Sequence, residues 1–168
     1  MTTRRLPDEL ETIVALKEDR VTRAKRIAEA IREAGDYRWV GIYDVNFRSG
    51  TVSNIVWSGP NAPAYPVFPI TKGLTSRAIT ARKTVNVGDV ASDQSYLTAL
   101  DTTRAEIIVP ILDDTGEHVI GTIDVESEHL NAFDSKAQAL LEESANVLTK
   151  FWTSGNHMPA AETKLEER

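Results

Sequence analysis

The chain has 168 residues, no cysteine, and a formal net charge of −6 from 19 Lys and Arg against 25 Asp and Glu. Its length predicts one domain, and the missing thiol excludes disulfides, Cys-ligated zinc and thiolate nucleophiles. The acidic balance argues against nucleic acid as a partner. The amino terminus has no signal-peptide pattern, and no run approaches the ~18 apolar residues of a membrane span, so we expect a cytoplasmic protein without membrane contact.

The first predicted element is one long helix over residues 10–34. Its apolar residues recur at helical spacing, and Gly35 is expected to supply a left-handed stop. Five of them form a heptad-like seam: Val14, Val21, Ala24, Ala28 and Ile31. The seam is longer than one small sheet needs, so either the domain or a second copy of the chain must cover it, and we expect a homodimer.

The middle of the chain alternates between strand, turn and helix patterns. Six segments are predicted in order as strand, strand, loop, helix, strand and loop: 38–45, 51–57, 58–69, 73–82, 84–90 and 91–103. In the last of these loops, Tyr96, Leu97 and Leu100 are the expected buried anchors.

The C-terminal third begins with a second hairpin. Strands over 106–112 and 118–126 flank an Asp-Asp-Thr-Gly turn, and a helix over 135–152 begins after Asp134, its expected N-cap. Helices at both ends of the chain would cover one face of a mainly antiparallel sheet. The central loops would then lie over the other face, where ligands usually bind.

Three parts of the chain are distinguished by composition. Residues 1–20 are predicted to be an N-terminal helical extension, residues 21–153 the folded domain, and the polar residues 154–168 a flexible tail.

This order of elements resembles the GAF domain, a small-molecule-sensing fold. Within GAF domains the chain is most similar to the free methionine-R-sulfoxide reductases, over about residues 20–150. Five stretches carry the resemblance: 39–43, 71–76, 97–100, 105–110 and 121–127. The resemblance implies an α+β fold, with a central antiparallel sheet, the N- and C-terminal helices on one face and ligand loops on the other.

The departure from that family is chemical. The reductases act through a thiolate and resolving cysteines, and the matching positions here hold Tyr65, Thr75 and Ala99. A hydroxyl or methyl group cannot attack the sulfoxide sulfur and then leave by disulfide exchange. The resemblance therefore predicts no catalytic residue for this reaction.

What remains of the family's site is acidic. Glu106, Asp124 and Glu126 match the positions that hold the amino group of the free amino acid. Asp124 and Glu126 are two apart on one predicted strand, so they leave the same face, with Ile123 and Val125 pointing to the core. Two such charges suit a cationic group such as an ammonium. A sheet with one solvated face gives the same alternation, and that alternative stays open.

Aromatic side chains offer walls for a pocket. Trp57, Tyr65 and Tyr96, together with Thr75, complete the expected ligand-binding set, whereas Tyr43 and Phe68 favour core packing. The three histidines are isolated, and a haem or bilin has no cysteine for attachment, so no metal and no cofactor are expected.

The leading hypothesis is a non-catalytic, sensor-type domain that binds an unknown small molecule, with an amine as the group that the acidic pocket would hold. Two alternatives stay open: a dimerisation or protein-interaction module with a vestigial pocket, and a catalytically altered relative of the reductases. No kinase, cyclase or DNA-binding segment is recognisable in these residues, so any output would use a partner or self-assembly.

Overall fold

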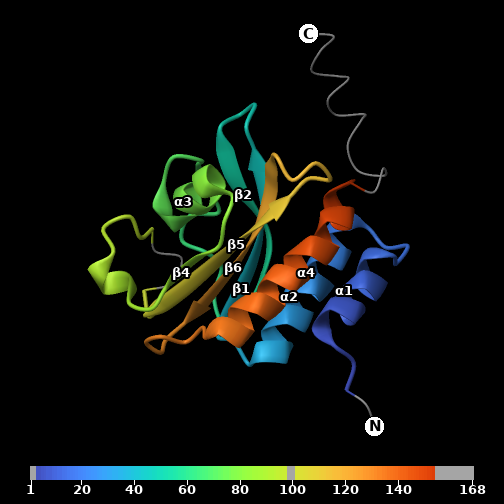
Figure 1. The fold of residues 1–168 in the computed structure, drawn as a ribbon, viewed down its shortest axis with the longest axis horizontal. Coiled ribbons are helices and arrows are strands. Elements are labelled where there is room, and N and C mark those ends of the chain that lie inside the picture. The colour runs from blue at the N-terminus through green and yellow to red at the C-terminus, as the bar shows by residue number, and fades with distance from the viewer. Residues whose placement is uncertain (1–2, 98–100, 154–168) are drawn as a thin grey trace.

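A computed structural model describes residues 3–97 and 101–153 as one antiparallel sheet with helices on both faces (Figure 1). The strand order is β3-β2-β1-β6-β5-β4. The strands are Trp39–Asn46 (β1), Thr51–Ser58 (β2), Val67–Pro69 (β3), Val85–Val87 (β4), Ala105–Leu112 (β5) and Val119–Ser127 (β6). The helices are Leu6–Val14 (α1), Arg20–Gly35 (α2), Gly73–Ala81 (α3) and Ser135–Thr153 (α4). The predicted α+β class and antiparallel sheet are confirmed.

The prediction of one helix over residues 10–34 is wrong, because the chain turns between α1 and α2. Asp19 caps α2, with its carboxylate accepting from the Thr22 backbone N–H at 2.8 Å. Arg23 reaches back and donates to the Val14 carbonyl at 2.9 Å, which satisfies the end of α1. The turn lets α1 pack on α4, so the seam is not continuous, and Val21 is 58% exposed.

The end of α2 also differs from the prediction. Gly35 stays helical, and the left-handed residue is Asp36, with φ of 50°. A Cβ at Gly35 would lie 2.1 Å from the Tyr37 ring, so close packing requires glycine there. Asp tolerates the left-handed region better than most residues, which allows the chain to turn one residue later.

Removing the α2 cap tests this account of the turn. Asp19→Ala is expected to lower the free energy of unfolding by about 1 kcal/mol, because the first-turn N–H groups lose their acceptor. Urea denaturation measures the change, with Asp114→Ala in the exposed β5–β6 turn as the control. Equal losses in the two variants would show that the cap does not stabilise the turn.

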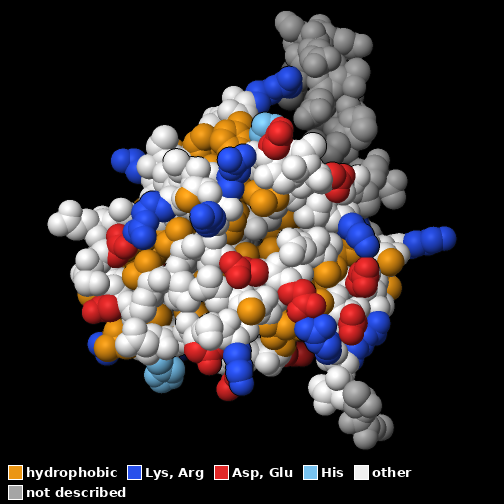
Figure 2. Space-filling view, viewed as in Figure 1, with side chains coloured by type: hydrophobic (Ala, Val, Ile, Leu, Met, Phe, Trp, Pro, Cys, Tyr) orange, Lys and Arg blue, Asp and Glu red, His pale blue; other side chains and the backbone are white. Residues whose placement is uncertain are grey.

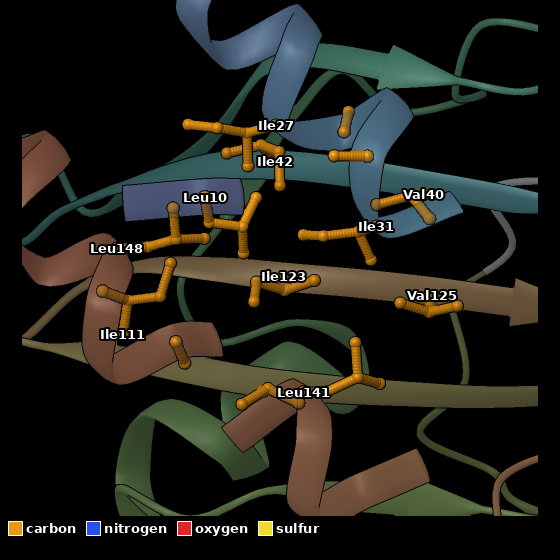
Figure 3. Close-up of a cluster of buried hydrophobic side chains, with 14 of the residues drawn as sticks. Leu10, Ile27, Ile31, Val40, Ile42, Ile111, Ile123, Val125, Leu141 and Leu148 are labelled. Atoms are coloured by element: carbon orange, nitrogen blue, oxygen red, sulfur yellow. The ribbon is translucent and has the colours of Figure 1, made fainter. Parts of the chain in front are cut away.

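The main core lies between the sheet and the layer of α1, α2 and α4. Figure 3 shows aliphatic side chains from these three helices meeting those of β1, β5 and β6. Ile123 and Val125 are fully buried in this core, as the alternation predicts. In Figure 1 the three helices lie side by side on one face of the sheet. No helix among the described residues is both long enough and apolar enough to cross a membrane.

The opposite face carries α3 and the loops. The predicted loop 58–69 contains the short edge strand β3, which pairs with β2 and ends at a proline. The predicted strand 84–90 is shortened to β4, because Asp89 accepts from the Ala91 N–H and starts a 3-10 turn. Tyr96 and Leu97 are half-buried rather than fully buried, and Leu100 lies outside the described residues, as does the predicted tail.

Surface charge is mixed. On the face seen in Figure 2, basic and acidic side chains are interspersed, with apolar side chains exposed between them. The acidic balance is therefore spread over this face rather than gathered into one patch.

Candidate functional site

Three carboxyl side chains meet on the face of the sheet that carries α3. Glu106 on β5 lies directly opposite Glu126 on β6. Asp124 precedes Glu126 by two residues on β6, so its side chain leaves the same face of the sheet. Glu106 is 3% exposed, Asp124 7% and Glu126 0%, and a carboxylate oxygen from each lies within 4.8 Å of the others. We call these three residues the acidic cluster. Its burial rules out the alternative of a solvated sheet face.

Burial dominates the electrostatics of the acidic cluster. It raises the pKa of Glu106 well above its ordinary value, and repulsion from Asp124 and then Glu126 raises it further. Burial and the Glu126 charge likewise raise the pKa of Asp124 well above its usual range. Burial also raises the pKa of Glu126, although the neighbouring Thr103 and Tyr96 hydroxyls offset part of that rise. The folded chain therefore resists three negative charges at this point.

Two carboxylate oxygens in the acidic cluster have no hydrogen-bond partner among the described residues. They are Asp124 Oδ1 and Glu126 Oε2, and the nearby Thr122 hydroxyl on β6 also lacks one. Buried polar atoms in folded proteins are almost always paired, because leaving one unpaired costs about 1–3 kcal/mol. These oxygens are acceptors that a bound donor can use.

A small cavity opens beside the acidic cluster. Nine residues line it, from β1, β3, β5, β6, α3 and the neighbouring loops: Tyr43, Tyr65, Phe68, Gly73, Leu74, Thr75, Leu97, Glu106 and Asp124. Its volume is about 20 Å³, close to the space that one water molecule needs. Four of the residues predicted from the sequence, Tyr65, Thr75, Glu106 and Asp124, therefore share one cavity.

Two other predicted residues lie differently. The Tyr96 hydroxyl donates to Glu126 Oε1 at 3.1 Å, so Tyr96 contacts the acidic cluster without lining the cavity. Trp57 does not line the cavity. Its ring packs beside Trp39 and Tyr43, with the Lys25 ammonium 5.6 Å from its centroid. Lys25 also donates to the Trp57 carbonyl, so this tryptophan belongs to the α2–β2 packing.

From the sequence, the other five cavity residues were assigned to packing or left out; Tyr43, Phe68 and Gly73 are the informative ones. Tyr43 and Phe68 were expected only in the core, yet both line the cavity while packing edge to face, with centroids 5.9 Å apart. Gly73 begins α3 with φ of +72°, and a Cβ there would lie 3.0 Å from the Leu97 Cβ. A glycine at the start of a predicted helix was the sequence feature that could have indicated Gly73, because glycine allows a positive φ and a close approach of the backbone to a neighbouring residue.

The acidic cluster is the one group among the described residues with three acidic, His or Cys side chains close enough to share a metal ion. Calcium and magnesium take six or more oxygen ligands, mostly from carboxylates, carbonyls and water, and the rest of the cavity lining offers only the side-chain hydroxyls of Tyr43, Tyr65 and Thr75. An ammonium has three N–H donors, which is the number of carboxyl groups here. The three carboxyl groups, as hydrogen-bond acceptors, therefore fit an ammonium group better than a calcium or magnesium ion.

Comparison with known proteins agrees with this geometry. The GAF domain family matches residues 19–150. The structure of free methionine-R-sulfoxide reductase from Neisseria meningitidis, solved with its substrate, is 33% identical, with a TM-score of 0.78 over 88% of this chain and 86% of that one.

Two curated relatives point the same way. GAF domain-containing protein A of Dictyostelium discoideum is 23% identical over 141 residues, which are 83% of this chain and 85% of the relative. Free methionine-R-sulfoxide reductase of Saccharomyces cerevisiae is 27% identical over 119 residues, 70% of this chain and 64% of the relative. The chain, which has no cysteine, therefore belongs to the GAF domain family and is similar to the free methionine-R-sulfoxide reductases within it.

Proposed function

We propose that this GAF domain binds a small amine-bearing molecule and acts through binding rather than turnover. The observation that carries the proposal is the buried acidic cluster, which has two unpartnered carboxylate oxygens, one of them on Asp124 in the cavity wall. A chain with these residues loses stability by desolvating three carboxyl groups, and a cation bound among them would offset that cost.

Another part of the cavity lining suits a negative group. Gly73, Leu74 and Thr75, the first three residues of α3, line it, and no side chain caps this helix. Uncapped N–H groups at a helix start attract anions, and the helix dipole adds to that attraction. Carboxyl groups and a helix N-terminus that line one cavity match the two charges of a zwitterion, so we propose a free amino acid as the ligand class.

The relatives indicate which amino acid to test first. The Neisseria meningitidis reductase was solved in complex with its substrate, and by its name that enzyme reduces free methionine-R-sulfoxide. Without cysteine, this chain has no thiolate to attack the sulfoxide sulfur. We propose that it retains the binding part of such a site and lacks the reducing part.

Binding of an amino acid requires the cavity to widen, since about 20 Å³ holds one water molecule. Tyr65, which is largely exposed, and the half-buried Leu97 form walls that lie outside the sheet. We propose that these side chains move aside, while the acidic cluster stays fixed on its paired strands.

A thermal-shift screen tests the proposal. Free amino acids, methionine sulfoxide and simple amines are added to the full chain, and a ligand should raise the melting temperature by mass action. For a ligand so found, Asp124→Asn is expected to weaken binding about tenfold, because one charged acceptor of the ammonium is lost. Isothermal titration calorimetry measures the loss.

Glu117→Gln is the matched control, because it removes one carboxylate from the exposed β5–β6 turn. This control should bind as tightly as the unaltered chain. If Asp124→Asn binds an amine ligand with unchanged affinity, the acidic cluster is not the ammonium site.

A second candidate function is a protein-interaction or dimerisation module. The observation that favours it is the pair of exposed apolar side chains Leu16 and Val21 at the α1–α2 turn. If a second copy covers this turn, Val21→Lys is expected to raise the dissociation constant of the dimer at least tenfold. Sedimentation velocity measures the change, with Val67→Lys at the exposed β3 edge as the control. A monomeric unaltered chain would remove this candidate.

A further inference from the structure

The acidic cluster has no basic partner within its cavity. No Lys, Arg or His is among the described residues that line the cavity. The neutral polar side chains near the cluster come from β1, β6, α3 and the loops, and all of them carry hydroxyls: Tyr43, Tyr65, Thr75, Tyr96, Thr103 and Thr122. Hydroxyls can donate hydrogen bonds, but they cannot balance the charge of three carboxylates.

Close, buried carboxyl groups without a cation share protons instead of all ionising. Glu106 is the group placed to hold the shared proton, because its side chain contacts both Asp124 and Glu126. Burial and its two acidic neighbours also raise its pKa well above the ordinary carboxyl value, which agrees with this placement.

We propose that the acidic cluster holds at least one proton in the free protein and exchanges it for the ammonium group of the ligand. The inference rests on the proposed function and adds how the same site is regulated. On binding, the carboxyl O–H bond breaks, the proton passes to solvent, and the carboxylate accepts N–H donors from the ammonium. One positive charge leaves and one enters, so the charge within the cluster is conserved.

This exchange makes binding depend on pH. A proton competes with the ammonium for the same oxygens, so affinity rises with pH, by up to tenfold per unit, while the cluster is protonated. The rise ends once the cluster has lost its proton or the ligand amine has lost its own. A chain of this kind responds jointly to the amine and to acidity.

The experiment is a pH titration of the side-chain carboxyl carbons of the full chain by NMR. Signals are assigned with Glu106→Gln, Asp124→Asn and Glu126→Gln, and the midpoints are read in the unaltered chain, so no variant has to keep its full stability. At least one of the three carboxyls should remain protonated at pH 7. Asp113 is the internal reference, because its hydrogen bond from Thr115 lowers its pKa. If all three deprotonate near the ordinary value of about 4, the inference is overturned.

The same titration in ammonium chloride tests the exchange. An ammonium ion is about the size of a water molecule, for which the cavity has room, whereas tetramethylammonium, at equal ionic strength, is too large and has no N–H. The raised midpoint should fall in ammonium chloride, by up to one pH unit per tenfold excess over the dissociation constant. An identical midpoint in both salts overturns the exchange. Because this test uses no amino acid, it is independent of whether the proposed ligand class is right.

Discussion

Replacing Phe151 with alanine is expected to lower the free energy of unfolding by about 3–5 kcal/mol. The Phe151 ring is fully buried on α4 and packs edge to face against Trp152, with centroids 4.9 Å apart. The guanidinium groups of Arg20 and Arg23 lie 5.2 and 5.3 Å from its centroid. Truncation removes the ring against which Arg20 and Arg23 of α2 stack, and it leaves a cavity that these arginines cannot fill.

Urea denaturation measures the loss, and Phe47→Ala is the control. Phe47 is 54% exposed in the β1–β2 turn, so its truncation should cost less than 1 kcal/mol. If both variants lose the same stability, Phe151 does not join the two helices as described.

The second large effect is a gain in stability rather than a loss. Glu106→Gln is expected to raise the free energy of unfolding at pH 8 by about 1–3 kcal/mol, because an amide can remain buried without ionising. Its NH₂ group can donate to the neighbouring Asp124 and Glu126 carboxylates, which Glu106 can do only while protonated. A substitution at a functional site that stabilises the fold is typical of a site whose residues are retained for binding.

The sign of the pH dependence follows from linkage. The pKa of Glu106 is raised in the folded state, so its protonated form stabilises the fold fully below the unfolded value of about 4.3. That contribution is lost as pH rises from there through the folded pKa. The unaltered chain should therefore lose stability between pH 4 and pH 8 relative to Glu106→Gln, and the two should converge near pH 4. Urea titrations at each pH measure this, with Glu117→Gln as the exposed control; a constant difference across pH would contradict the account.

Local patterns in the sequence were enough to predict five of the six strands and two of the three residues of the acidic cluster; the edge strand β3 lies in a segment predicted as a loop. Alternation along β6 placed Asp124 and Glu126 on one face and Ile123 and Val125 on the other, because side chains on a strand alternate with period two. Glu106 could be placed beside them only through the resemblance, since its contact depends on the β5–β6 register.

Features that depend on packing between distant segments were not predictable. The break between α1 and α2 depends on Arg23 reaching the Val14 carbonyl, a contact that helical periodicity does not reveal. Burial of the acidic cluster depends on α3 and the loops that cover that face of the sheet. Trp57 lies in a predicted strand but packs under Lys25 of α2, and composition alone cannot distinguish that position from a pocket wall.

A double-mutant cycle between ligand and protein determines whether the ammonium group of the ligand binds in the acidic cluster. The free amino acid selected by the screen, with methionine sulfoxide first, is compared with its desamino analogue, in which hydrogen replaces the ammonium. Calorimetry is done on the unaltered chain and on Asp124→Asn. Loss of the amine should weaken binding at least tenfold in the unaltered chain and clearly less in the variant. Equal losses in both proteins would contradict binding of the ammonium group in the acidic cluster.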